Sequence, residues 1–157
     1  MKQFLDTKGK IFTFLLFIGL LVSSCGNNEK EQAAQLLEEA RAHFDQGALD
    51  AARADIDTLR ARFPNVVEAR KGALKLHQEI ELKAAQLEMA KTDSLLQLAN
   101  KELEDMQKEV DKHKAALKAT PEELTLLTRT RIRRDSIRTQ FETLGAKIHY
   151  IHEKMKE

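Results

Sequence analysis

Cys25 is the only cysteine in the chain, and the residues before it suit a covalent reaction at its thiol. A head that carries Lys2, Lys8 and Lys10 precedes the apolar run 11–21, and small residues follow. A basic head, a short apolar run and small residues before a cleavage point make a secretory signal. The run is too short for a permanent membrane span, which needs roughly 20 apolar residues. The sequence therefore predicts a signal peptide over 1–24 and export of the rest.

The segment Val22-Ser23-Ser24-Cys25 resembles the lipobox of bacterial lipoproteins, in which an aliphatic residue and two small residues precede cysteine. The resemblance implies thioether lipidation of Cys25, cleavage before it, acylation of the new N-terminus and attachment to the cell envelope. In the lipoproteins that this segment resembles, an aspartate directly after the cysteine marks retention in the inner membrane. Gly26 occupies that position here, so the outer membrane is favoured, at either its periplasmic face or the cell surface. The alternative is an ordinary secreted protein that is cut near Ser24 and keeps a free thiol.

The charge balance argues against nucleic acid as a partner. The chain has 26 basic and 25 acidic side chains, of which the first 24 residues hold three and one. The remaining 23 basic and 24 acidic groups give a net charge of −1, which creates no general attraction to a polyanion. Lipidation of Cys25 would also leave no thiol for a disulfide or a metal.

Histidines offer the one spacing that could hold a metal ion. His149 and His152 lie on neighbouring helical turns, with Glu153 adjacent, but the sequence specifies no third ligand of the kind that a metal site needs. The other histidines are scattered and have no nucleophile beside them. No glycine-rich phosphate loop, carboxylate pair or catalytic triad is visible. We therefore predict no catalytic residue, no metal, no cofactor and no small-molecule substrate, and interpret the protein as not an enzyme.

One dense basic cluster could hold an anionic ligand. Its members are Arg129, Arg131, Arg133, Arg134 and Arg138. They could bind anionic lipid, lipopolysaccharide phosphate or an acidic partner. The structural alternative, which we favour, is that interhelical ion pairs set the register of a helical hairpin. In that case the opposing acidic residues are Glu102, Glu104, Asp105, Glu109 and Asp111. The expected overlay places Arg131, Arg134 and Arg138 over Glu102, Asp105 and Glu109.

Composition predicts an all-α fold, because strong helix formers dominate and aromatic residues make up only 5% of the chain. The predicted organisation is a signal peptide over 1–24 and a polar, lipidated tether over 25–28. A tetratricopeptide-like helical segment over 29–80 comes next. A long antiparallel two-helix coiled-coil hairpin over 81–157 follows, with its turn near Thr120-Pro121.

The helical segment begins with two helices joined by a short turn. Asn28 is the expected N-cap of the first helix, Gly47 the end of that helix, and Asn65 the cap of a third helix. The second helix is expected over Leu49–Arg62, and Pro64 stops it. This arrangement resembles one tetratricopeptide unit at Ala40, Gly47, Leu49, Ala52, Ile56, Leu59 and Pro64.

The ending Leu59–Pro64 also resembles the lipoprotein subunit of the outer-membrane β-barrel assembly machine, over about Ala33–Ala73 only. No second repeat follows at the spacing of 34 residues that the family shows. A continuous groove normally needs about three stacked repeats. We therefore predict one helix pair that packs on the start of a third helix, and no peptide-binding superhelix.

The hairpin is predicted from apolar residues at helical spacing. One stripe in the long helix contains Ala73, Leu76, Ile80, Ala84 and Leu87. The next contains Leu95, Ala99, Leu103, Met106, Val110 and Leu117. The last helix contributes Leu124, Leu127, Ile137, Phe141, Leu144, Ile148, Ile151 and Met155. With the long helix ending near Ala119, folding at Thr120 should pair Leu103 with Ile137, Ala99 with Phe141, and Leu95 or Leu96 with Leu144.

These expectations favour a non-enzymatic, lipid-anchored envelope protein that acts as a helical adaptor, scaffold or assembly-factor subunit. Its expected partners are the membrane, through Cys25, and an unidentified envelope protein. Two alternatives stay open. One is a module that binds anionic glycolipid through the cluster from Arg129 to Arg138. The other is an assembly factor for outer-membrane β-barrels.

Overall fold

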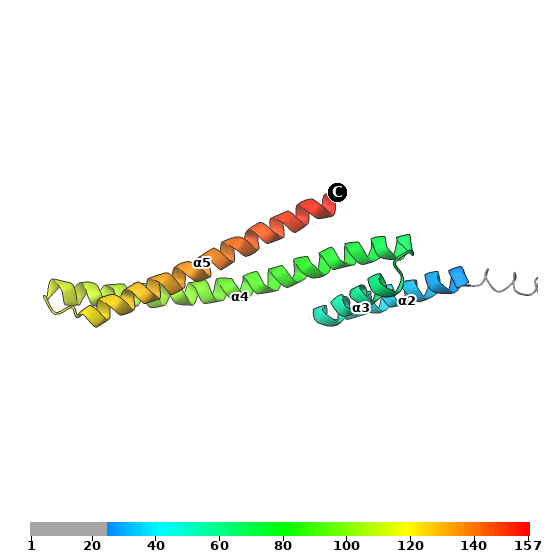
Figure 1. The fold of residues 1–157 in the computed structure, drawn as a ribbon. Helices are drawn as coiled ribbons and strands as arrows, with labels where there is room; N and C mark the ends of the chain where they lie inside the picture. Colours follow the sequence, from blue (N-terminus) through cyan, green and yellow to red (C-terminus); the bar gives the residue numbers. More distant parts are fainter. Residues whose placement is uncertain (1–24) are drawn as a thin grey trace, which may run out of the picture. The chain divides into compact units, whose positions relative to one another are not determined.

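The computed structural model describes residues 25–157, and the predicted signal peptide 1–24 lies outside the described residues. Four helices make up nearly all of this part of the chain, which contains no strand (Figure 1). They are α2 (Cys25–Asp45), α3 (Leu49–Arg62), α4 (Val67–Ala115) and α5 (Pro121–Lys156). Two compact units divide between His77 and Gln78, within α4. The prediction of an all-α chain is confirmed for the described residues.

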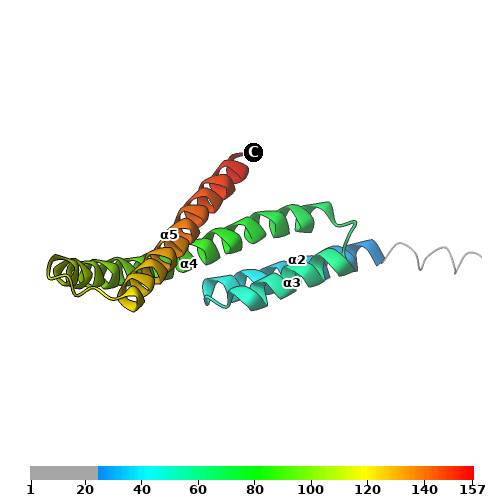
Figure 2. The same cartoon turned by 60° about the vertical axis from the view of Figure 1, so that its left-hand side comes forward.

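The first unit is built on the pair α2 and α3, which lie side by side in both views (Figures 1 and 2). Gly47 ends α2 by adopting a φ of 78°, and its N–H donates to the carbonyl of Phe44 at 2.9 Å. Glycine tolerates this left-handed conformation because it has no Cβ. His43 Nδ1 lies 2.6 Å from Asp55 Oδ2 and links the two helices. The predictions that Gly47 ends the first helix and that the second spans Leu49–Arg62 are confirmed.

Small side chains let the helices of this unit approach closely. Ala33, Ala40 and Ala52 are fully buried. At the start of α4, a Cβ on Gly72 would lie only 2.5 Å from Leu37 Cδ2, so α2 packs directly against the α4 backbone. Larger buried side chains complete this core, namely Ile56, Leu59 and Leu76. The unit is therefore one helix pair closed by the start of a third helix, as predicted.

The predicted tether is helical in the structure. α2 begins at Cys25, so the interpretation of 25–28 as a non-helical tether is wrong. Asn28 does not cap the helix; its Oδ1 accepts a hydrogen bond from Gln32 Nε2 at 2.7 Å, one turn further along. Cap spacing predicts a start only where the preceding residues leave the helix, and those before Asn28 continue it.

The start of α4 also differs from the prediction. The N–H of Val66 donates to the Phe63 carbonyl at 3.3 Å, a turn that carries the chain past Asn65 before the helix begins. The first helical bond runs from the Arg70 N–H to the Val66 carbonyl at 3.0 Å, which makes Val66 the N-cap and Val67 the first helical residue. The prediction of Asn65 as N-cap is wrong.

In the second unit, α5 begins with a complete capping box. The Glu123 N–H donates to Thr120 Oγ1 at 3.2 Å, and the Thr120 N–H donates to Glu123 Oε2 at 2.9 Å. Pro121 occupies the first helical position, where its missing N–H costs nothing. The other carboxylate oxygen of Glu123 lies 2.7 Å from His113 Nδ1, so one side chain caps α5 and holds the end of α4. The predicted cap at Thr120 is confirmed.

α4 ends at Ala115, about one turn before the predicted Ala119. Leu117 adopts a φ of 55°, the only positive φ of a non-glycine residue in the described chain. The N–H of Lys118 then donates to the His113 carbonyl at 2.8 Å, which completes a left-handed helix end. The prediction that α4 ends near Ala119 was wrong. It was based on Pro121, which fixes where α5 begins, whereas α4 ends where the Leu117 backbone turns left-handed.

This early end shifts the register of the hairpin by about one turn. Because His113 lies beside Glu123, counting back along the antiparallel helices places Ala99 level with Ile137 instead of Phe141. A Cβ on Gly145 would contact Met89, which fits the same register. Three predicted pairings are therefore wrong, namely Leu103 with Ile137, Ala99 with Phe141, and Leu95 or Leu96 with Leu144.

Leu117 provides a test of this helix end. We expect Leu117→Gly to stabilise the hairpin by about 1 kcal/mol, because glycine removes the left-handed strain of a side chain that is itself 96% exposed. Leu117→Ala keeps a Cβ and should give little gain. Thermal melts of the two variants measure the difference, and equal melting temperatures would contradict this account.

Along the hairpin, buried and half-buried positions repeat in alternate steps of four and three residues, as in a coiled coil. On α4 they are Ala85, Met89, Thr92, Leu96, Ala99, Leu103, Met106 and Val110. On α5 they are Leu127, Thr130, Arg134, Ile137, Phe141, Leu144, Ile148 and Ile151. The seam thus passes through two polar positions, Thr130 and Arg134.

The seam on α4 differs from the predicted stripes because one of its positions is polar. Thr92 is buried, and its hydroxyl donates to the Glu88 carbonyl at 2.9 Å, so the helix itself satisfies the hydroxyl. A stripe read from apolar residues alone skips Thr92. Leu87 and Leu95, on either side of Thr92, are therefore exposed. Three other predicted seam residues are exposed near the ends of the helices, namely Leu117, Leu124 and Met155.

Candidate functional site

The first candidate site is Cys25, where the sequence predicts lipid attachment. The structure places Cys25 at the first residue of α2. An attached lipid would therefore join the first helical unit directly, without a flexible segment between them. Among the residues that the structure describes, no helix is both long and apolar enough to cross a bilayer.

An apolar groove lies in the same unit, beginning one helical turn after Cys25. It has a volume of about 650 Å³. α2 supplies one wall, and the turn before α4 with the first turn of α4 supplies the other. Its lining residues are Glu29, Lys30, Ala34, Leu37, Asn65, Val66, Val67, Glu68 and Ala69. This groove was not predicted, because its two walls lie about 30 residues apart in the sequence and are brought together by helix packing, of which the contact of Gly72 with Leu37 is a part.

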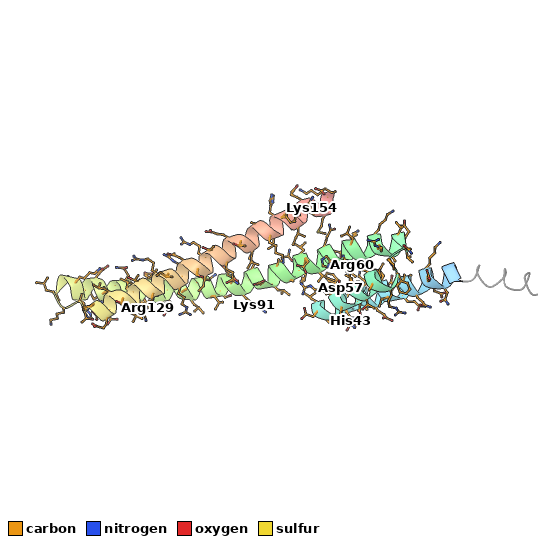
Figure 3. All side chains as sticks on the ribbon, in the orientation of Figure 1. His43, Asp57, Arg60, Lys91, Arg129 and Lys154 are labelled. Carbon is orange, nitrogen blue, oxygen red and sulfur yellow. The ribbon has the colours of Figure 1, made fainter. Side chains whose placement is uncertain are left out.

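The arginine cluster occupies the half of α5 nearest the turn, where Figure 3 labels Arg129. Arg133 Nη1 lies 3.2 Å from Glu102 Oε2, an ion pair between α5 and α4. Arg131 donates to Gln107 Oε1 at 3.1 Å, also across the hairpin. Both contacts are exposed, and exposed pairs contribute only about 0–1 kcal/mol each.

Arg134 differs from its neighbours because it lies in the seam. Its Nη1 donates to Asn100 Oδ1 at 3.4 Å. Its buried Nε lies 2.8 Å from Asp135 Oδ1 without the geometry of a hydrogen bond, so that contact is electrostatic. Arg134 therefore adds a polar layer to the coiled coil between the layers of Thr130 and Ile137.

The predicted overlay of arginines on acidic residues is wrong in its pairs. Arg133, which that overlay left out, pairs with Glu102. Arg131 and Arg134 contact amides instead of carboxylates. The reason is the one-turn shift in register, which moves every acidic residue of α4 relative to α5. Opposite charges do face each other across the hairpin at Glu102, but they do not form the continuous network that the sequence suggested.

The five arginines do not form one surface. Each residue rotates by about 100° around a helix. Arg133, one residue before the seam residue Arg134, therefore lies on one side of the seam, and Arg131, three residues before it, lies on the other. We call the two sides the Glu102 flank and the Gln107 flank, after their α4 partners. Residues seven apart share a side, so Arg138 lies with Arg131 on the Gln107 flank. Arg129, one turn before Arg133, lies on the Glu102 flank.

The histidines lie apart from one another in their contacts. His149 and His152 are exposed beside the seam residues Ile148 and Ile151. His43 contacts Asp55 in the first unit, and His113 contacts Glu123 at the hairpin turn. Within residues 25–157, no group of three or more potential ligands is arranged to hold a metal ion.

The turn of the hairpin carries a perturbed carboxyl group. The backbone N–H of Thr120, and then the His113 side chain, lower the pKa of Glu123 below its ordinary value of 4.5. Both interactions favour the charged carboxylate. A group whose pKa is lower in the folded state stabilises the fold above its unfolded pKa and loses that contribution as the pH falls through the folded pKa.

We expect acid to loosen this turn in a way that depends on Glu123. Lowering the pH from 7 to below 4.5 should reduce the melting temperature of the unaltered chain, and Glu123→Gln should flatten that dependence. The matched control is Glu122→Gln, a change of the neighbouring exposed carboxylate that makes neither bond. If both variants follow the same pH profile, Glu123 does not hold the turn.

Comparison of the chain with protein-family models, with curated proteins and with solved structures finds no match.

Proposed function

We propose that this chain is a lipid-anchored, non-enzymatic protein of the bacterial envelope that acts as a helical adaptor or scaffold. The observation that carries the proposal is the segment Val22-Ser23-Ser24-Cys25, which ends a predicted signal peptide. The start of α2 at Cys25 supports it, because an anchored helix would hold the first unit close to the membrane. The outer membrane is the favoured location, since Gly26 follows the cysteine.

The adaptor role is supported by the groove in the first unit. Leu37, Val66 and Val67 give it an apolar surface, and Val67 is 60% exposed. Apolar concave surfaces of this kind commonly contact partners. An assembly role toward β-barrels remains a narrower form of this proposal and rests on the resemblance over Ala33–Ala73.

The experiment is site-specific photocrosslinking in intact envelopes. A photoreactive residue at Leu37, inside the groove, should yield a discrete crosslinked partner. The same residue at Ala54, an exposed position on α3 outside the groove, should not. Equal crosslinking at both positions, or none at either, would contradict an adaptor groove. Identification of the captured protein would decide whether it belongs to β-barrel assembly.

The glycolipid alternative is less well supported by the positions of the arginines. Arg129 and Arg133 lie on one flank and Arg131 and Arg138 on the other, so no single headgroup contacts all of them. A headgroup site would therefore have to lie on one flank alone. Vesicle binding that disappears when Arg131 and Arg138 alone are changed to glutamine would instead favour a lipid site on the Gln107 flank.

A further inference from the structure

The Glu102 flank of the hairpin leaves large apolar side chains uncovered. On α4, Leu95 and Leu98 are 52% and 66% exposed. Leu95 lies one heptad and Leu98 one helical turn before Glu102, so both share its side of the helix. On α5, Leu126 is 53% exposed and lies seven residues before Arg133. Single exposed leucines are ordinary, but Leu95 and Leu98 lie one turn apart and form an apolar patch, and Leu126 lies nearer the hairpin turn, level with Val110.

A groove of about 480 Å³ runs along the same flank. Met106, Val110 and Leu126 give it an apolar floor, and acidic residues of α4 line its side. Two of those acidic residues, Asp105 and Glu109, form no salt bridge within the described part of the chain. On α5, Arg129 likewise forms none there. Asp105 interacts electrostatically with Lys108 without forming a salt bridge. The flank therefore carries charges of both signs, on different helices, that are not joined in salt bridges.

We propose that the Glu102 flank is the interface of a twofold homodimer, in which α4 of each hairpin packs against α5 of its partner. In a parallel dimer, the two hairpin turns lie at the same end. A given residue then lies at the same height along the hairpin in both copies. The register that joins His113 to Glu123 places Arg129 level with residue 107. Each Arg129 then faces the partner's α4 between Asp105 and Glu109. The opposite charges meet twice, once on each side of the symmetry axis.

Burial of apolar side chains would also favour the dimer. The seam residues Leu96, Leu103 and Ile137 are only half-buried, because one neighbouring helix covers a side chain from one direction. Stacking two hairpins makes a four-helix bundle, which would cover these seams and bury the exposed leucines. A basic helix of another protein could meet the acidic side alone, but it would leave Arg129 unpaired. A second copy satisfies both charges at once.

The experiment reverses the charges on each half of the interface in the full chain, held in detergent. One variant carries Asp105→Lys and Glu109→Lys, and the other carries Arg129→Glu. Sedimentation equilibrium should show a dimer for the unaltered chain. Each variant alone should dissociate at least about tenfold more readily, because like charges then face each other. An equal mixture of the two variants should recover the dimer, since every interface again pairs opposite charges.

The matched control is Arg138→Glu, on the Gln107 flank, which should dimerise like the unaltered chain. A monomeric unaltered chain would overturn the proposal, and so would variants that dimerise normally. Variants that fail to recover on mixing would show that the charges do not meet across an interface. The lipid state of Cys25 is read separately, by mass spectrometry of the same samples. Failure of the dimer and failure of the proposed anchoring are therefore distinguishable.

Discussion

Cys25→Ala should convert the membrane-bound protein into an unprocessed precursor or a soluble protein. Without the thiol there is no thioether, and without the thioether the modified N-terminus does not form. Acyl chains contribute about 0.8 kcal/mol per buried methylene, so several chains hold a protein far more firmly than one. Partition between detergent and aqueous phases measures the loss, and we expect it to be nearly complete.

A nearby substitution separates lipidation from general damage to the N-terminus. Asn27→Ala lies two residues after Cys25 and keeps the lipobox-like segment, so this variant should stay in the detergent phase. Mass spectrometry of the unaltered protein supplies the sharper test. A mature N-terminus with an unmodified Cys25 thiol would refute the lipid anchor, even if the protein sediments with membranes.

Ala52→Glu should unfold the first unit. Ala52 is fully buried on α3, in the unit where α2 and α3 pack most closely. A leucine there would overpack the helix pair, at a cost of about 1–3 kcal/mol. A glutamate should cost more, because its carboxylate would lose water without gaining a partner. Far-UV circular dichroism during heating measures the loss of stability.

Ala54→Glu is a matched control for this effect. It makes the same change on the same helix, but at an exposed position two residues away. Surface substitutions usually alter stability by no more than about 0.5 kcal/mol. A melting temperature lowered equally by both glutamates would mean that helix content, and not packing at Ala52, explains the loss.

Local signals account for the parts of the fold that were predicted correctly. Gly47, Thr120 and Pro121 each act through backbone geometry within one turn, and each lies where the prediction placed it. The helix α3 has the predicted bounds because Gly47 and Pro64 limit it on both sides. Such signals depend on neighbouring residues alone, so a single sequence contains them.

The register of the hairpin needed information that the sequence does not display. A leucine at position 117 gives no sign of a left-handed conformation, which glycine or asparagine usually signals. A threonine at position 92 gives no sign of a buried seam position. Each effect is local, but together they place the end of α4 and several contacts between α4 and α5 about one turn from where they were predicted. The arginine pairs were wrong for the same reason.

The candidate sites divide in the same way. The lipobox-like segment at Cys25 is continuous in sequence and could be found there. The groove beside Leu37 and the leucine patch around Leu98 could not, because each depends on which residues the packed helices leave uncovered. The arginines were found as a group from their density in the sequence. Their division between two flanks follows only from the seam, which the structure places through Arg134.

The carboxylate of Glu123 also bears on the order in which the hairpin folds. It joins His113 to the start of α5 across only ten residues, and closing a loop of that length takes roughly 10–100 ns. Every later contact between α4 and α5 spans a longer stretch of chain, up to Gln78 with Lys154. Once the turn has formed, each pair of contacting residues closes only a short additional loop. The contacts between α4 and α5 can therefore form in order from the turn toward the open end of the hairpin, without a slow search for distant contacts.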